Sequence, residues 1–155
     1  QLMQGEFAQT VRRVLELHDL DPGRLELELS ERGVLSGDYD VITQLHAIKE
    51  LGVRLSIDDF GTGDSAIAYL RELPVDVLKI DRSYIAGLTD NRKDAAIISA
   101  MIALGHSLDL RIVAEGVETN EQRDALRELG CDEIQVYIMS HPVNSGLFPN
   151  LSSKP

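Results

Sequence analysis

The sequence is poor in cysteine and in long apolar runs, and each shortage excludes a class of protein. Cys131 is the only cysteine among 155 residues, so neither an intrachain disulfide nor a thiolate metal cage can form. This cysteine usage fits a reducing, cytoplasmic setting. No apolar run approaches the roughly 18 residues that cross a membrane, and the first residues lack a signal-peptide pattern. We therefore expect a globular domain without a transmembrane segment.

Basic side chains are also scarce. The chain has 15 Lys and Arg against 26 Asp and Glu, a formal net charge of -11. Such a surface repels the phosphates of DNA and RNA, so no nucleic-acid partner is expected. A small phosphate ester held through metal ions is compatible with this charge, because bound cations reverse the local potential. A hydrophobic content of 43% suits one globular domain or a piece of a larger one.

Several nucleotide and metal motifs are missing too. There is no GxGxxG fingerprint, and Gly61-Thr62-Gly63 is too short for a phosphate-binding P-loop and lacks its Lys-Ser/Thr ending. The four histidines share no metal-ligand spacing, and packing on helix faces explains them better. They are His18, His46, His106 and His141.

What the sequence does contain is a regular alternation of short apolar runs and amphipathic stretches. Strands are expected over residues 25–29, 53–57, 75–81, 111–116 and 132–139. Helices are expected over residues 7–20, 41–51, 67–71, 91–106 and 120–129. This alternation predicts a parallel sheet in an α/β fold. Residues 143–155 are interpreted as a C-terminal tail.

Polar and charged residues stand where these predicted strands end. They are Glu28, Glu31, Asp58, Asp59, Lys79, Asp81, Glu115 and Gln135. In α/β proteins the working residues lie at this edge, and five such strands in succession are typical of the catalytic rim of a (β/α)8 barrel. A complete barrel takes ~250 residues, so this chain has strands for little more than half of one.

Asp58 and Asp59 are the centre of the pattern. Two neighbouring carboxylates repel each other unless protons or cations intervene. Mg²⁺ or Mn²⁺, which favour carboxylate oxygens, would remove that repulsion. The alternative interpretation is that Asp58 caps a helix while Asp59 faces water.

Five segments resemble the C-terminal two-thirds of an EAL domain, the bacterial phosphodiesterase that linearises cyclic di-GMP. In family order and spacing, from about residue 25 to residue 142, they are Glu28-Leu29-Ser30-Glu31, Asp58-Asp59-Phe60-Gly61-Thr62-Gly63, Leu78-Lys79-Ile80-Asp81, Ala114-Glu115-Gly116-Val117-Glu118-Thr119 and Gln135. The resemblance implies a TIM-like (β/α)8 barrel with strands 4–8 present, so that residues 1–155 form one partial EAL domain. The Glu-Ala-Leu motif and a metal-binding asparagine would precede Gln1. We therefore expect weak or no catalysis by this polypeptide alone.

The resemblance also implies a two-metal site for Mg²⁺ or Mn²⁺ and a role for each strand-end residue. Glu28, Asp58 and Asp59 would be metal ligands. Lys79 would orient the nucleophilic water or offset phosphate charge, and Glu115 would bind metal through water or act as a general base. Gln135 would hydrogen-bond the water or a phosphate oxygen. The residues that order the loop after Asp59 would be Glu31, Thr62 and Asp81.

Simpler structural roles are open for three of these residues. Glu28 could be a solvated residue of an alternating strand, and Glu31 could be a carboxylate in the first turn of a helix. For Lys79, an ion pair with Asp81 is the structural alternative, although a lysine on a strand buried on both faces favours function.

Two departures from the family pattern favour a different function. Asp64 stands where a large residue such as tyrosine is usual, and Val136 stands where the family has glycine. The alternative is a degenerate EAL domain that senses cyclic di-GMP or transmits a signal. In either case the resemblance implies a homodimer through the loop and helix after Asp59, and an upstream regulatory domain in a bacterial parent protein.

Overall fold

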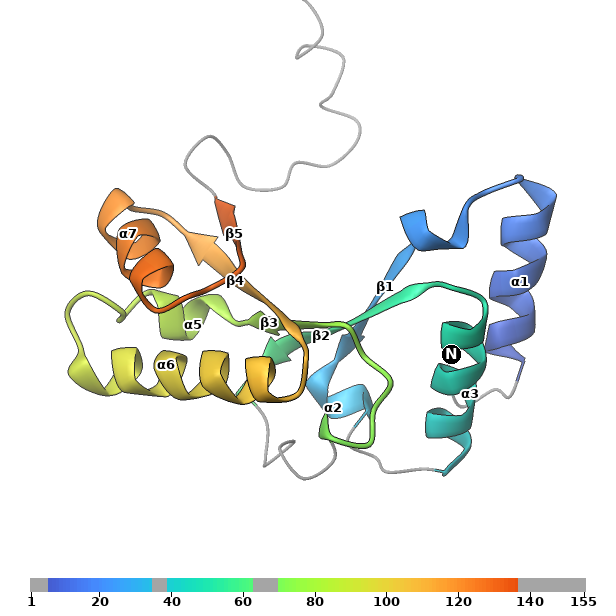
Figure 1. Ribbon diagram of the computed structural model, residues 1–155, viewed down its shortest axis with the longest axis horizontal. Coiled ribbons are helices and arrows are strands. Elements are labelled where there is room, and N and C mark those ends of the chain that lie inside the picture. The colour runs from blue at the N-terminus through green and yellow to red at the C-terminus, as the bar shows by residue number, and fades with distance from the viewer. Residues whose placement is uncertain (1–5, 35–38, 63–69, 137–155) are drawn as a thin grey trace, which may run out of the picture.

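The computed structural model describes residues 6–34, 39–62 and 70–136 (Figure 1). Its elements along the chain are α1 (Phe7–Leu17), η2 (Pro22–Arg24), β1 (Glu26–Ser30), α2 (Glu31–Val34), α3 (Tyr39–Glu50), β2 (Arg54–Phe60), β3 (Val77–Ile80), α5 (Arg82–Ile85), α6 (Arg92–Ser107), β4 (Arg111–Val117), α7 (Asn120–Glu128) and β5 (Glu133–Val136). Within these ranges, no helix combines the length and the apolar character that crossing a bilayer requires.

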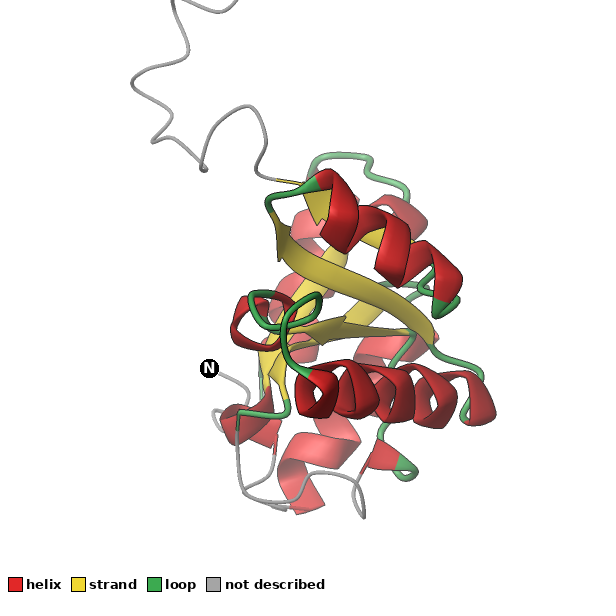
Figure 2. Cartoon of the chain, turned by 90° about the vertical axis from the view of Figure 1, so that its left-hand side faces the viewer, coloured by secondary structure: helices red, strands yellow, loops and turns green. Residues whose placement is uncertain are grey.

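The five strands form one parallel sheet whose spatial order, β1-β2-β3-β4-β5, is also their order in the chain. The predicted α/β fold with a parallel sheet is therefore confirmed. Helices α1 and α3 pack together beside β1 and β2, while α5, α6 and α7 lie toward β4 and β5 (Figures 1 and 2). All five strands point the same way, so their carboxyl ends share one edge.

The two faces of the sheet differ in chemistry because side chains alternate along a strand. One set of positions is apolar and buried with the helices in a single core. Its strand members include Leu55, Ile57, Leu78, Ile80, Ile112 and Ala114. The alternate positions are largely polar, and they include Glu26, Glu28, Arg54, Asp58, Lys79, Arg111, Glu115 and Glu133. The sheet therefore presents a charged face opposite its packed face.

Two predicted elements, the third strand and the first helix, were too long for identifiable reasons. The third strand is shorter than residues 75–81, because the carboxylates at both ends bond to other groups. Asp76 Oδ2 accepts the backbone N–H of Leu55 at 2.8 Å, and Asp81 caps α5 by accepting the N–H of Ser83 at 3.0 Å. The first helix ends at Leu17 because the chain turns through Asp19, whose φ is 50°.

The second predicted strand was too short. β2 continues through Asp58 and Asp59 to Phe60, which is buried. Aspartate disfavours strands, so sequence preference placed the end too early. Most of the predicted helix at 67–71, the end of the strand predicted to reach 139, and the tail at 143–155 lie outside the described residues.

Candidate active site

Two register shifts shape the carboxyl edge of the sheet. Between β2 and β3, Ile57 pairs with Leu78 and Phe60 pairs with Ile80, so Asp58 and Asp59 together oppose Lys79. Between β4 and β5, Ala114 pairs with Ile134 and Val117 with Val136, so Glu115 and Gly116 oppose Gln135. Each is a β-bulge, a device that bends a strand and re-aims side chains next to active sites. Five of the predicted site residues take part in these two bulges.

The bulges require backbone that few residues adopt. Asp59 has φ 55°, a left-handed conformation that aspartate tolerates better than most side chains. Gly116 has φ 69°, and a Cβ built there would lie 2.5 Å from Cβ of Arg82. Both the angle and the close approach call for glycine at position 116.

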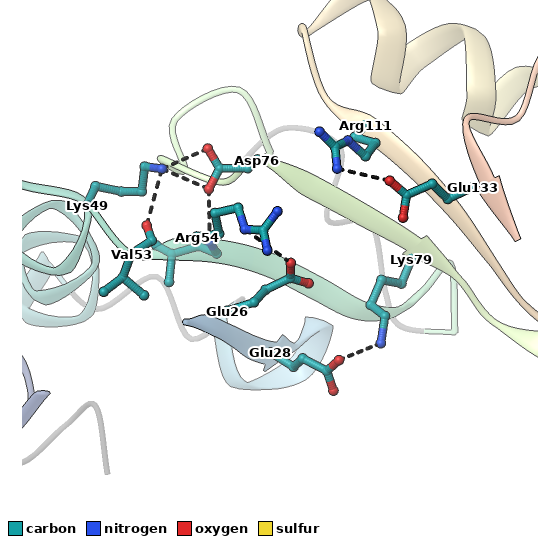
Figure 3. A network of polar contacts seen from close by, with 10 residues as sticks. Glu26, Glu28, Lys49, Val53, Arg54, Asp76, Lys79, Arg111 and Glu133 are labelled. Atoms are coloured by element: carbon teal, nitrogen blue, oxygen red, sulfur yellow. Dashed lines mark hydrogen bonds and ion pairs between the residues drawn. The ribbon is translucent and has the colours of Figure 1, made fainter. Parts of the chain in front are cut away.

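Lys79 is the centre of the cluster, and its side chain is only 10% exposed. Its Nζ lies 2.7 Å from Glu28 Oε1 on β1, 2.6 Å from Glu115 Oε1 on β4 and 3.8 Å from Asp58 Oδ1 on β2. Figure 3 shows the lysine reaching toward Glu28 across the charged face. One ammonium thus joins carboxylates from three other strands, which offsets the cost of burying it.

The structural alternative for Lys79, an ion pair with Asp81, is wrong. The ion pairs of Lys79 in the described part of the chain are with Glu28, Asp58 and Glu115. Asp81 turns away to cap α5. Burial acts to raise the pKa of Asp81, but hydrogen bonds from Ser83 and Arg82 outweigh burial and lower it.

Lys79 stays charged in this arrangement. Burial acts to lower its pKa, but hydrogen bonds to Glu115 and Glu28 and the charge of Asp58 outweigh burial and raise the pKa well above its ordinary value. An ammonium held so firmly supplies a fixed positive charge and is unsuited to transferring a proton at neutral pH.

Asp58 and Asp59 lie inside β2, so the alternative that Asp58 caps a helix is also wrong. The carboxylate of Asp58 accepts the N–H of Asp59 at 3.0 Å. Asp59 is exposed overall, but partial desolvation of its carboxyl group, together with the charges of Asp58 and Asp81, raises its pKa. The carboxyl groups of Asp58, Asp59 and Asp81 therefore lie close together at the ends of β2 and β3.

The turn after Asp59 is tied to both neighbouring segments. Glu31 is 3% exposed, and its Oε2 accepts the backbone N–H of Gly61 at 2.9 Å. The hydroxyl of Thr62 donates to the carbonyl of Asp59 at 2.8 Å. Tyr84, which sequence reasoning missed, donates its hydroxyl to the carbonyl of Gly61 at 2.5 Å. No sequence motif marks that tyrosine, because the contact joins α5 to a turn 23 residues earlier in the chain.

The donor set fits the chemistry of a hard divalent cation. Glu28, Asp58, Asp59 and Glu115 offer the carboxylate oxygens that Mg²⁺ and Mn²⁺ prefer, and three of these four already surround one cation, the Lys79 ammonium. Within the described ranges, no three His, Cys, Asp or Glu side chains form a ready-made cage. A metal at this edge would therefore share the carboxylates with Lys79. Gln135 is exposed on β5 opposite the Glu115 bulge.

Other ion pairs continue along the charged face away from the strand ends. Arg54 lies 3.7 Å from Glu26, and Arg111 Nη1 lies 2.9 Å from Glu133 Oε1 (Figure 3). Their side chains are substantially exposed, so each contributes roughly 0–1 kcal/mol. They keep this face charged without forming part of the Lys79 cluster.

Comparison with known proteins gives the family. The EAL domain profile matches residues 1–142. The bifunctional diguanylate cyclase/cyclic di-GMP phosphodiesterase MucR of Pseudomonas aeruginosa is 42% identical over 143 residues, covering 92% of this chain and 21% of MucR. The cyclic di-GMP phosphodiesterase NbdA of the same organism is 44% identical over 142 residues, covering 92% of this chain and 18% of NbdA. The chain thus spans about a fifth of the length of these two relatives.

Solved structures give the same result. The structure of the MucR phosphodiesterase in complex with c-di-GMP superposes with a TM-score of 0.86 at 41% identity, covering 94% of this chain and 59% of that one. The EAL domain of Mycobacterium smegmatis DcpA gives a TM-score of 0.86 at 39% identity, covering 92% of this chain and 64% of that one. The chain belongs to the EAL domain family, and its five parallel strands are part of that family's TIM-barrel fold.

Proposed function

We propose that this chain supplies the catalytic strand ends of a metal-dependent phosphodiesterase that hydrolyses cyclic di-GMP to linear pGpG. The observation that carries the proposal is the Lys79 ammonium, held between carboxylates of β1, β2 and β4. The similarity to cyclic di-GMP phosphodiesterases supports the choice of substrate.

Glu28, Asp58 and Asp59 would hold Mg²⁺ or Mn²⁺. When bound, the metal supplies an acidified water and neutralises charge on the phosphate. Hydrolysis forms a bond from a water oxygen to phosphorus and breaks the bond from phosphorus to one ribose oxygen, which takes up a proton from solvent and leaves as a hydroxyl, and this opens the ring of the dinucleotide. The remaining residues bind, orient and exchange protons.

Lys79 provides a fixed positive charge where negative charge develops on the phosphate oxygens, which is the kind of preorganised stabilisation that lowers a barrier. One carboxylate oxygen of Glu115 lies 2.6 Å from Lys79 Nζ. In the proposed reaction its other oxygen accepts a proton from the attacking water. Gln135, opposite Glu115 across the second bulge, would donate its amide to the water or to a phosphate oxygen.

The test is hydrolysis of cyclic di-GMP with Mn²⁺ by this chain joined to the rest of the barrel, as the wild type and with Asp58→Asn or Lys79→Met. Each substitution should lower kcat/KM by at least about 100-fold, because each removes a charge from the reacting centre. Glu26→Gln is the matched control, since Glu26 lies on the same face of β1 but pairs with Arg54 instead of Lys79. Turnover by Asp58→Asn equal to that of the wild type would rule the proposal out.

The binding-sensor alternative rests on Asp64 and Val136. Asp64 lies outside the described residues. Val136 pairs with Val117 just beyond the bulge, is 40% exposed, and is not among the described non-glycine residues with positive φ. A valine side chain is thus accommodated there without a backbone angle that needs glycine. Binding of cyclic di-GMP by the chain joined to the rest of the barrel, without metal-dependent turnover, would establish the sensor instead.

We further propose a homodimer through the loop and helix after Asp59, an upstream regulatory domain and a cytoplasmic location. The loop and helix fall mainly at 63–69, outside the described residues. Support for an upstream domain comes from MucR, of which the matched region is only 21%. Light scattering at several protein concentrations tests the dimer, and a constant monomer mass would contradict it.

A further inference from the structure

Two side chains from different parts of the chain bind the backbone of one residue, Gly61, at the end of β2. Gly61 follows the Asp58–Asp59 bulge, and its N–H donates to Glu31 at the start of α2. Its carbonyl accepts the hydroxyl of Tyr84 on α5 at 2.5 Å. Glu31 lies in one of the segments that resemble EAL domains, whereas Tyr84 lies outside all of those segments.

The packing around Gly61 leaves no room for a side chain at this position. Its φ is 96°, and a Cβ built there would lie 2.4 Å from Met101 Cε and 2.9 Å from the ring of Tyr84. The tyrosine therefore acts twice on one residue, since its ring packs on the α-carbon while its hydroxyl holds the carbonyl. Together these contacts define where the chain leaves the strand.

The position of Gly61 controls the orientation of the Asp59 carboxylate, two residues earlier in the chain. Asp59 is joined to the turn through its own carbonyl, which accepts the hydroxyl of Thr62 at 2.8 Å and the N–H of Thr62 at 3.3 Å. A shift of the Gly61 peptide would thus pull directly on Asp59. The helix that carries Tyr84 has Asp81 as its N-cap, and the carboxyl group of Asp81 lies close to that of Asp59.

We propose that Tyr84 is a positioning residue for the metal-binding carboxylates, an inference that rests on the proposed metal role of Asp58 and Asp59. Its hydroxyl fixes the Gly61 peptide and so sets the orientation of the strand end for a divalent cation. Tyr84 touches neither the substrate nor the metal in this role.

The experiment compares Tyr84→Phe with the wild type for Mn²⁺ affinity, measured from the electron paramagnetic resonance of free Mn²⁺, with Tm recorded alongside. Tyr84→Phe keeps the packing ring and should weaken Mn²⁺ binding about tenfold, as loss of an orienting partner does at other metal sites. The matched control is Ser107→Ala, which also deletes a hydroxyl bonded to a backbone carbonyl, that of Ala103 in α6, remote from the strand ends.

Amide hydrogen exchange of the metal-free protein gives a second readout. Tyr84→Phe should speed exchange at Gly61 and Thr62, whose N–H groups bond to Glu31 and Asp59. Unchanged Mn²⁺ affinity, with or without a lower Tm, would overturn the proposal, as would a wild type that binds no Mn²⁺ or an equal loss in Ser107→Ala. If the chain joined to the rest of the barrel fails to hydrolyse cyclic di-GMP while Tyr84→Phe still weakens Mn²⁺ binding, the proposed function fails and the positioning role stands.

Discussion

At the scale of single residues, Lys79 joins folding and chemistry in one side chain. It sits in a four-residue strand whose every member is buried, where an unpaired charge would be costly. Carboxylates of β1, β2 and β4 solve that problem by converging on its Nζ. The same convergence gathers the charges that the proposed reaction needs, so the lysine holds the site together before any substrate arrives.

Lys79→Met should therefore destabilise the metal-free protein by roughly 1–3 kcal/mol, because it leaves hydrogen-bonded carboxylates without their cation. Mn²⁺ should restore part of the loss, since a ligand that binds only the folded state stabilises it. Urea unfolding with EDTA and with Mn²⁺ measures both effects. Lys93→Met, at an exposed position of α6, is the control, and an equal effect of both substitutions would contradict the prediction.

At the scale of elements, the same clamp occurs twice at the amino-terminal edge of the sheet. Asp76, just before β3, accepts the N–H of Leu55 at 2.8 Å and pairs with Lys49 at the end of α3. Asp132, just before β5, accepts the N–H of Ile112 at 2.7 Å and faces His106 at the end of α6, with Nε2 at 3.0 Å. In each case a carboxylate just before one strand accepts a backbone N–H of the neighbouring strand. It also contacts a side chain at the end of the helix that precedes that neighbouring strand.

The Asp132 clamp should make stability depend on acidity. Burial acts to raise the pKa of Asp132, but the N–H of Ile112, His106 and Arg111 outweigh burial and lower it below its ordinary value of 3.8. A carboxyl with a depressed folded-state pKa contributes stability above pH ~4, and that contribution is lost as pH falls through the lower folded-state value. Asp132→Asn should therefore flatten the pH dependence of unfolding below about pH 4.

Urea unfolding at a series of pH values from 3 to 6 checks this prediction. Asp124→Asn is the control, since Asp124 is exposed on α7 and pairs only with its neighbour Arg123 among the described contacts. Wild type and Asp132→Asn losing stability in parallel on acidification would show that the clamp carries no pH dependence.

At the scale of the whole molecule, the sheet in the described residues is open, because β1 and β5 each pair on one side only. Exposed edges and a charged face leave the Lys79 cluster in contact with water, which weakens electrostatic catalysis. We predict that this chain alone hydrolyses cyclic di-GMP at least about 100-fold more slowly than a protein carrying the rest of the barrel seen in the MucR structure, of which it covers 59%. Equal kcat/KM values for the two would contradict this.

Much of the fold was predictable from the sequence. Apolar runs with helical stretches between them predicted five strands and their parallel arrangement. Polar residues at the predicted strand ends indicated which edge of the sheet carries the candidate site, but not the contacts of Lys79. These signals come from residues close together in the sequence, so they can be recognised without knowledge of the tertiary structure.

The remainder depended on contacts between distant segments. α2 and α5, each of four residues, are too short to show helical periodicity. The carboxylates that contact Lys79 were not predicted, because the register of the strands decides which residues face one another. That register changes at the bulge between β2 and β3. Tyr84 and Gly61 are 23 residues apart, a separation that composition and spacing do not connect.

The bulge in β2 also changes what a deletion would do to this protein. Phe60 is buried and pairs with Ile80 because β2 has two residues, Asp58 and Asp59, where β3 has only Lys79. Deleting Asp58 or Asp59 would remove that extra residue and leave the ladder from Ile57 to Phe60 regular. It would also leave one carboxylate, where two now oppose Lys79, so the length of this strand is as much a part of the site as the identity of its residues.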